Sequence, residues 1–133
     1  MKSFRLLMVG MAMVASHHIQ GQSISDLLGK WTADYEMDGE EFSIVYEFQS
    51  KEGKTLCYAR SMTNDKGQSV SINTLAMNNI TFTNSSGTAN YMIDYDDEKY
   101  EVEADLELTS KDRLEVSYFY WGFGDDEVWI KKE

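Results

Sequence analysis

The feature that most constrains this chain is an alternation of apolar and polar residues with a period of two. It is clearest in residues 99–109, where aromatic and aliphatic side chains share one parity and acids occupy the other. Such alternation is typical of a β-strand with one buried face. The predicted inward side chains of this segment are Tyr100, Val102, Ala104, Leu106 and Leu108.

Further segments alternate in the same way, and each is expected to direct one face to a shared interior. The predicted inward sets are Trp31/Ala33/Tyr35/Met37, Phe42/Ile44/Tyr46/Phe48, Leu56/Tyr58/Arg60/Met62, Ala89/Tyr91/Ile93/Tyr95, Leu114/Val116/Tyr118/Tyr120 and Val128/Ile130. Residues 69–83 fit either two short strands or one bulged strand. Residues 24–28 can form one helical turn, which Gly29 ends.

The connections between these segments are short and rich in turn residues, as at Asp38-Gly39. A Greek key needs at least one long connection, so we expect the strands to follow one another as a meander. A meander with one apolar face buries that face and loses its exposed edges when it closes. We therefore predict an all-β fold, an antiparallel up-and-down barrel of roughly eight to ten strands. The alternative is an open curved sheet.

The first 21 residues have the layout of a secretory signal peptide. Lys2 and Arg5 form a basic head, an apolar run follows, and small residues stand at Ser16 and Gly21. The apolar run is too short to span a bilayer, and the leader has no lipobox cysteine. We expect cleavage after Gly21 or Ser16, a secreted or periplasmic domain over residues 22–133, and no membrane insertion.

The charge and the histidines exclude several functions. The chain has 23 Asp and Glu against 12 Lys and Arg, a net charge of −11, so no nucleic acid is expected as a partner. His17 and His18 both lie in the leader, which leaves no histidine for a catalytic triad or a zinc site. The acidic turn at residues 125–127 lacks the calcium-loop pattern. We therefore expect no metal and no cofactor.

We also expect no enzymatic activity. Hydrolysis by paired carboxylates needs two acids in one concave site, and the alternation places nearly all acids outside. Cys57 is the single cysteine and falls on the outward parity, so it forms no internal disulfide. An intermolecular disulfide or an inert thiol remain the two alternatives for it.

The sequence Gly29-Lys30-Trp31, directly after the helical turn, resembles the G-x-W signature of the lipocalin and fatty-acid-binding (calycin) barrels. The resemblance is closest to small exported lipocalin-like domains of bacteria, and it implies a lipocalin-like barrel over residues 22–133. In that superfamily the tryptophan closes the barrel floor and a basic side chain from the last strand lies across it. Lys132 shares the parity of Val128 and Ile130, so we expect Lys132 to project toward Trp31.

The predicted inward tyrosines indicate either a ligand cavity or a filled core. Tyr35, Tyr46, Tyr58 and Tyr118 offer aromatic walls with hydroxyl groups, as small-molecule pockets do. Arg60 can anchor a ligand carboxylate, or it can reach solvent or an acid at a strand end. We expect a monomeric carrier of a small hydrophobic or amphipathic ligand. The alternative is a filled barrel that acts as an interaction or inhibitor-like module without a small-molecule ligand.

Overall fold

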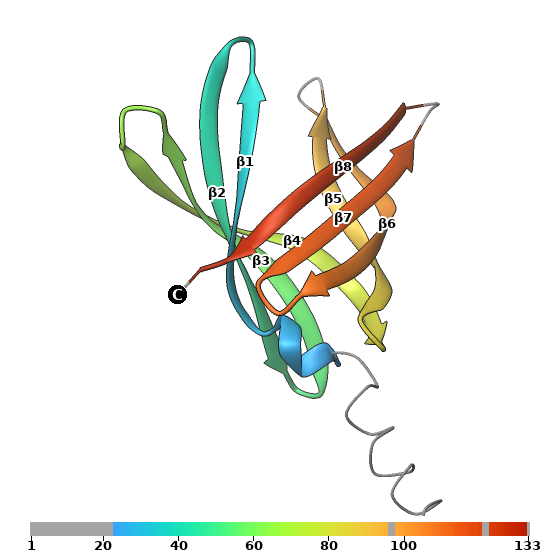
Figure 1. Cartoon of the computed structure of the whole chain (residues 1–133). Helices are drawn as coiled ribbons and strands as arrows, with labels where there is room; N and C mark the ends of the chain where they lie inside the picture. Colours follow the sequence, from blue (N-terminus) through green and yellow to red (C-terminus); the bar gives the residue numbers. More distant parts are fainter. Residues whose placement is uncertain (1–22, 96–97, 121–122, 133) are drawn as a thin grey trace, which may run out of the picture.

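The chain folds into a closed antiparallel barrel of eight strands in sequence order (Figure 1). The computed structural model describes residues 23–95, 98–120 and 123–132. The strands are β1 (Gly29–Met37), β2 (Glu40–Lys51), β3 (Lys54–Asn64), β4 (Ser69–Thr83), β5 (Ser86–Tyr95), β6 (Glu98–Ser110), β7 (Arg113–Tyr120) and β8 (Phe123–Lys131). The predicted all-β up-and-down barrel is confirmed. The proposed leader over residues 1–21 lies outside the described residues.

Residues 69–83 form the single strand β4, so of the two alternatives the one bulged strand is observed. Asn79 has a positive φ of 52°, and the pairing of β4 with β5 shifts register between Asn78 and Thr81. Gly87 on β5 lies directly against this bulge, since a Cβ there would collide with the Thr81 carbonyl oxygen. A glycine is therefore required at this point of the β4–β5 pair.

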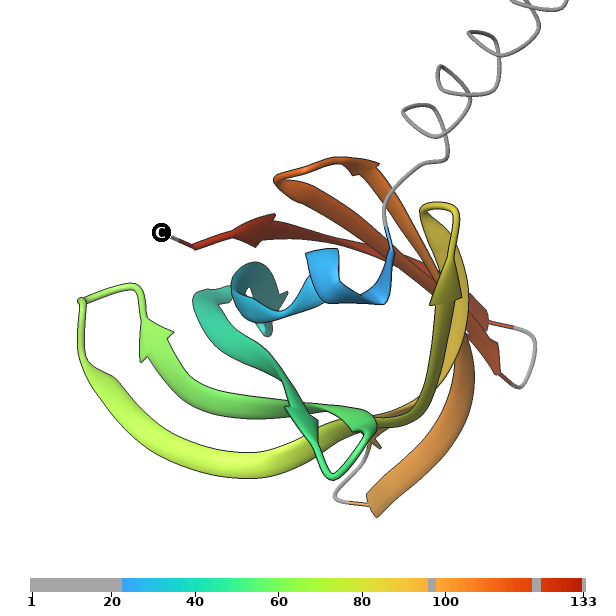
Figure 2. The ribbon, with the colours of Figure 1, turned by 90° about the horizontal axis from the view of Figure 1, so that it is seen from below.

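One end of the barrel is closed by the 3-10 turn η1 (Ile24–Leu27), which lies across the opening (Figure 2). Leu27 and Trp31 are fully buried. The Trp31 indole Nε1 donates a hydrogen bond of 2.8 Å to the Leu27 carbonyl oxygen, which satisfies the one polar atom of the buried ring. Trp31 thus lies at the closed end, where the resemblance to calycin barrels places it.

The basic residue beside Trp31 is Lys131, so the prediction of Lys132 is wrong. Lys131 Nζ lies 4.7 Å from the centroid of the Trp31 ring and donates a 2.6 Å hydrogen bond to the Leu28 carbonyl oxygen. Lys132 is exposed. Gly29 makes room for this arrangement, because it has a φ of +111° and a Cβ there would lie 3.3 Å from Lys131 Nζ.

The cause of the error is the parity of β8, which is opposite to the prediction. Trp129 is fully buried, whereas Val128 and Ile130 are 39% and 47% exposed. Three consecutive apolar residues give no alternation from which to assign a face. The pairing with β7 assigns it, because Trp129 stands opposite the buried Leu114 and directly opposed residues of antiparallel strands share a face.

The predicted parity of β3 is also wrong over its first half. Cys57 and Ala59 are buried in the core, which places Tyr58 and Arg60 on the outer face. The parity of β3 changes at Arg60, where the register shifts against both β2 and β4, because a bulge places an extra residue in the strand and changes which of the following residues face inward. Met62 accordingly lines the interior again. Burial raises the pKa of the Cys57 thiol well above its ordinary value, so the inert alternative holds for this cysteine.

The interior next to η1 is filled by side chains, and we call this part of the barrel the closed half. Its fully buried side chains are Leu27, Trp31, Phe48, Cys57, Met77, Leu106, Leu114 and Val116. They come from η1 and from strands around the whole barrel, so they tie every part of the wall to one core.

Within the described residues, no helix is long and apolar enough to span a bilayer.

Candidate functional site: a cavity in the open half of the barrel

A cavity of about 590 Å³ occupies the end of the barrel opposite η1, and we call this part the open half. Its apolar wall is formed by Met37, Phe42, Ile44, Met62, Met92 and Ile93. Its base is polar and is formed by Tyr35, Tyr46, Tyr91, Tyr118 and Glu127. A volume of this size falls within the range of small-molecule sites, which combine apolar walls with a few polar groups.

The base of the cavity is organised around the half-buried carboxylate of Glu127. This side chain points inward because it has the same parity as Trp129 on β8. Glu127 Oε1 accepts hydrogen bonds from Tyr35 Oη at 2.7 Å, Tyr91 Oη at 2.9 Å and Trp129 Nε1 at 2.9 Å. Glu127 Oε2 accepts one from Tyr118 Oη at 2.7 Å. Four donors on one carboxylate fix its position, since hydrogen bonds to a charged acceptor are the stronger ones.

The tyrosine hydroxyl groups form a connected network above this carboxylate. Tyr46 Oη lies 2.6 Å from Tyr35 Oη and 3.3 Å from Tyr91 Oη. The Tyr46 ring stacks on Trp129 with centroids 3.9 Å apart and planes 4° apart. Burial raises the pKa of Tyr35, Tyr46 and Tyr91 well above the ordinary value of 10. These phenols therefore stay protonated near neutral pH and remain hydrogen-bond donors.

Tyr118 has the same character at the edge of the network. Burial, followed by its hydrogen bond to the carboxylate, raises the pKa of Tyr118 well above its ordinary value. Its hydroxyl also lies 3.4 Å from Asp125 Oδ2. Two carboxylates, Glu127 and Asp125, therefore approach one phenolic proton at the side of the cavity.

Three of the predicted ligand-binding residues come together at this base, namely Tyr35, Tyr46 and Tyr118. The other two, Tyr58 and Arg60, lie on the outer face of β3 and are excluded from the cavity. The prediction that they line the interior is wrong because the parity of β3 changes at Arg60, between the inward Ala59 and the inward Met62.

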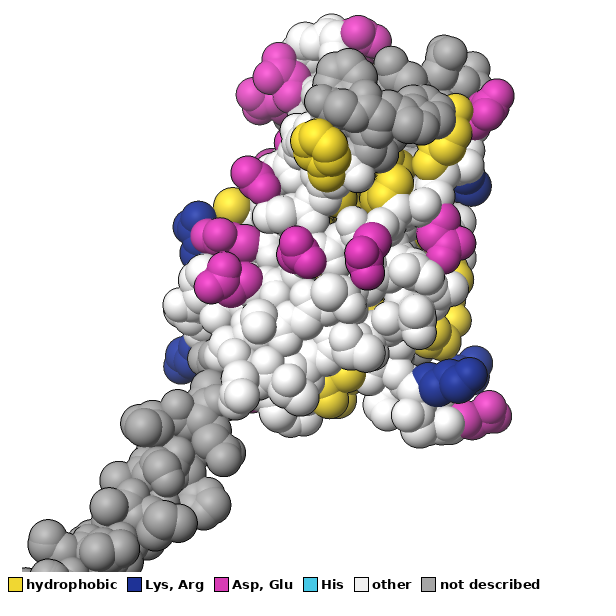
Figure 3. Space-filling model, turned by 90° about the vertical axis from the view of Figure 1, so that its right-hand side faces the viewer, with side chains coloured by type: hydrophobic (Ala, Val, Ile, Leu, Met, Phe, Trp, Pro, Cys, Tyr) yellow, Lys and Arg dark blue, Asp and Glu magenta, His cyan; other side chains and the backbone are white. Residues whose placement is uncertain are grey.

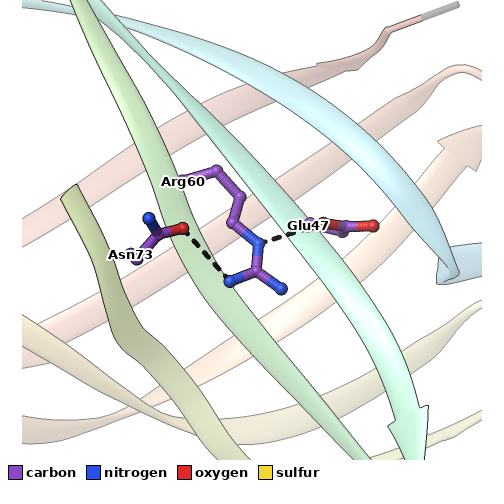
Figure 4. A network of polar contacts seen from close by, with 3 residues as sticks. All are labelled: Glu47, Arg60 and Asn73. Atoms are coloured by element: carbon purple, nitrogen blue, oxygen red, sulfur yellow. Dashed lines mark hydrogen bonds and ion pairs between the residues drawn. The ribbon is translucent and has the colours of Figure 1, made fainter. Parts of the chain in front are cut away.

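Arg60 instead belongs to a surface network (Figure 4). Arg60 Nε donates to Glu47 Oε1 at 3.0 Å, and its terminal nitrogen donates to Asn73 Oδ1 at 3.3 Å. The guanidinium carbon lies 4.7 Å from the centroid of the Tyr58 ring. The alternative expectation for Arg60 is confirmed for the acid partner, Glu47, but Arg60 lies within β3 and not at a strand end.

Sequence reasoning missed Glu127, which it assigned to an acidic turn together with Asp125 and Asp126. In the structure, Glu127 lies within β8 and faces inward. A signal was present in the tyrosines, because several phenols on inward positions need hydrogen-bond partners when they are buried. Only an acceptor on an inward position can satisfy them, and the corrected parity of β8 supplies one.

The wall of the open half is incomplete along the seam between β1 and β8. Among the described residues, β1 pairs with β8 only at residues 31–33, and beyond them the β1–β2 and β7–β8 hairpins diverge (Figure 1). A second cavity of about 470 Å³ follows this seam. Tyr35, Asp125 and Glu127 line both cavities. The polar base of the open half can therefore be reached from the side as well as from the end.

The charged residues that line the open-half cavity are all acidic. They are Asp94, Asp125 and Glu127, and no Lys or Arg is among the described lining residues. Within residues 23–95, 98–120 and 123–132, no group of three His, Cys, Asp or Glu side chains is arranged to hold a metal ion. The site offers hydrogen-bond acceptors, phenolic donors and aromatic faces.

No protein-family model, curated protein or solved structure matches this chain. The closed eight-stranded meander, with Trp31 beneath the N-terminal turn, is consistent with a calycin-like barrel. A function has to be inferred from the cavity and the residues around it.

Proposed function

We propose that this chain is a lipocalin-like carrier that binds one small amphipathic ligand in the open half of its barrel. The observation that carries the proposal is the 590 Å³ cavity, which has an apolar wall and a polar base held in place by Glu127. Two chemically different ends in one cavity match a ligand with an apolar part and a polar group.

The apolar part of the ligand lies against Ile44, Met62 and Ile93 in this proposal, where its transfer from water contributes about 25 cal/mol per Å² of buried apolar surface. Unbranched methionine side chains line this wall, and their flexibility lets them adapt to ligands of different shape. The polar group of the ligand reaches the base, beside Tyr118 and Glu127. The hydrogen bonds within the base hold these acceptors in place before the ligand arrives.

We further propose that the protein acts outside the cytoplasm as a monomer, after removal of its leader. The layout of residues 1–21 supports export.

A binding role is favoured over catalysis by the hydrogen bonds of Glu127, the acid at the base of the cavity. A glycosidase needs one acid that presents a proton to the leaving group. Glu127 instead accepts four hydrogen bonds, so it is committed as an acceptor.

The alternative function is an interaction module without a small-molecule ligand. The filled closed half supports it, because half of the interior has no space for a ligand. The two functions differ in what the open half does, so a test of ligand binding there separates them.

The test uses the full chain expressed with export in a bacterial host, with the N-terminal residue of the purified protein identified by mass spectrometry. The neutral dye Nile red is titrated into it and dye fluorescence is recorded. We expect an increase that saturates at one dye per chain. The variant Ile93→Trp fills the cavity and should weaken dye binding by about tenfold or more, since it removes most of the apolar contact.

The matched control is Thr83→Trp, which adds a tryptophan at an exposed position near the end of β4 and outside the lining of both cavities. This variant should bind the dye as the parent does. Melting temperatures of both variants show whether they remain folded. Absence of dye binding by the folded parent, or equal binding by both tryptophan variants, would contradict the proposed function.

A further inference from the structure

We propose that the polar group recognised in the open half is a cation, so that the ligand is a small amphipathic organic ammonium compound. The inference rests on the proposed function and deepens it by naming the ligand class. It is carried by the charges, the acceptors and the aromatic faces of the same cavity.

The first observation is the absence of a positive partner for an anionic ligand. No Lys or Arg is among the described residues that line the cavity. Arg60, the residue that the sequence offered for a ligand carboxylate, lies outside and is paired with Glu47. Lys99 pairs with Asp94 at 3.1 Å, and both side chains are 72% exposed. A carboxylate or phosphate in the cavity would therefore face acids without compensation.

The second observation is the acidic surface around the opening. Figure 3 shows acidic side chains gathered toward the open end of one face of the barrel. Exposed acids at this end include Glu36, Asp38, Glu40, Glu41, Asp125 and Asp126, and they outnumber the described basic residues there, Lys66 and Lys99. Charges of one sign around a concave site raise the local concentration of ligands with the opposite sign and speed their association. The surface thus favours the approach of a cation.

The third observation is an acceptor at the side of the base that is free to take a ligand. The Tyr118 hydroxyl has one proton, and its 2.7 Å contact with Glu127 Oε2 is much shorter than its 3.4 Å contact with Asp125 Oδ2. Asp125 Oδ1 accepts the backbone N–H of Asp126 at 2.9 Å. Within the described part of the chain, Asp125 Oδ2 therefore has no short hydrogen bond. An ammonium group has up to three N–H donors and can bind there.

The fourth observation is the set of aromatic rings around the same space. Tyr35 stacks on Phe42 with centroids 5.5 Å apart, and Tyr91 meets Tyr118 edge to face at 5.3 Å. A cation within about 6 Å of a ring face is attracted by the ring quadrupole. Carboxylates and aromatic rings together form a site for a desolvated organic cation.

The experiment compares three ligands with the same alkyl chain: octylammonium, octanol and octanoate. Binding to the full chain is measured by displacement of Nile red at low ionic strength. We expect octylammonium to bind at least about tenfold more tightly than octanoate, with octanol between them. The affinity for octylammonium should fall as salt is added, because salt screens the acids near the solvent, and the affinity for octanol should not.

A pair of variants tests whether Asp125 provides the negative charge that binds the ammonium group. Asp125→Asn should weaken octylammonium binding by about three- to fivefold, the effect of one partly exposed ion pair, and should change octanol binding by less than about twofold, since the amide oxygen still accepts from a hydroxyl group. Asp112→Asn removes the same charge in the β6–β7 turn at the closed end and should change neither.

Equal or tighter binding of octanoate would overturn the inference, as would equal effects of the two variants. Binding of octanol without any preference for octylammonium would refute the cation specificity while leaving the proposed function intact. Failure of Nile red and octanol to bind would instead refute the proposed function.

Discussion

The closed half and the open half of this barrel share every strand but differ in packing, pairing and charge. The closed half is filled by fully buried side chains and contains the β1–β8 pairing. The open half contains the cavity and the unpaired seam. Basic side chains surround the closed end, including Lys30, Lys51, Lys54, Lys111, Arg113, Lys131 and Lys132. The difference teaches that one continuous sheet can place its stability at one end and leave the other end for binding.

The largest expected effect is the loss of stability when a side chain is truncated in the closed half, compared with a truncation in the open half. Leu114→Ala removes a fully buried side chain from the closed half and should lower the free energy of unfolding by about 2–5 kcal/mol. Ile93→Ala removes a similar volume from the cavity wall, which already borders open space, and should cost less than about 1.5 kcal/mol. Denaturant unfolding measures both. Equal losses would show that the two halves contribute alike.

The next effect concerns the carboxylate at the base of the open half. Glu127→Gln replaces one of the two acceptor oxygens by an NH₂ donor, although four donors converge on this side chain. We expect a loss of about 1.5–3 kcal/mol in the free energy of unfolding. Glu107→Gln, on the exposed face of β6, is the matched control and should change the free energy by less than about 0.5 kcal/mol. A loss at Glu127 no larger than the control would argue against a base organised by this carboxylate.

A smaller effect separates the two lysines at the closed end. Lys131→Met removes the ammonium over Trp31 and its hydrogen bond to the Leu28 carbonyl oxygen. It should cost about 1 kcal/mol in denaturant unfolding. Lys132→Met changes an exposed side chain and should have almost no effect. A larger loss for Lys132→Met than for Lys131→Met would contradict the observed parity of β8 and support the parity predicted from the sequence.

The smallest of these effects near neutral pH is that of the buried tyrosines on stability, and it appears in alkaline solution. Tyrosines of the unfolded chain ionise near pH 10, whereas burial raises the pKa of Tyr35, Tyr46, Tyr91 and Tyr118 in the folded state. The folded state then binds more protons than the unfolded state. The contribution of these tyrosines to the free energy of unfolding should therefore be constant below pH 10 and should fall as the pH rises above it.

Two variants identify the source of this alkaline loss. Tyr35→Phe removes one of the buried phenols and should make the fall above pH 10 less steep. Phe119→Leu changes an exposed aromatic side chain that carries no hydroxyl group and should leave the slope unchanged. The measurement is urea unfolding at a series of pH values. Identical slopes for both variants would contradict a protonated tyrosine network.

The architecture could be predicted because the local signals agree with one another. In β6 each inward residue is apolar and each outward residue between 101 and 107 is acidic, and the structure buries Ala104, Leu106 and Leu108 as expected. Short connections between such strands leave the meander as the simplest arrangement. Period and turn length are properties of the chain itself, so they can be read without knowledge of the partners.

The site could be predicted only in part, because the faces of β3 and β8 depend on their neighbours. The change of parity in β3 at Arg60 is seen as a shift of register against β2 and β4, and no residue type in β3 announces it. In β8, Val128, Trp129 and Ile130 are all apolar, so either parity satisfies the hydrophobic pattern. The general tendency of acids to be outside then assigned Glu127 to a turn. Its inward position follows from the pairing of Trp129 with Leu114.

The most direct test of the account is a titration of the uniformly ¹⁵N-labelled full chain with octylammonium, followed by two-dimensional NMR. The account predicts saturable shifts of backbone amide signals around the cavity, at Ile44, Met62, Ile93, Tyr118 and Glu127. Amide signals of the closed half, such as those of Phe48, Cys57 and Leu114, should stay in place. Shifts centred on the closed half, or confined to the outer face of the barrel, would contradict the claim that the open half is the binding site.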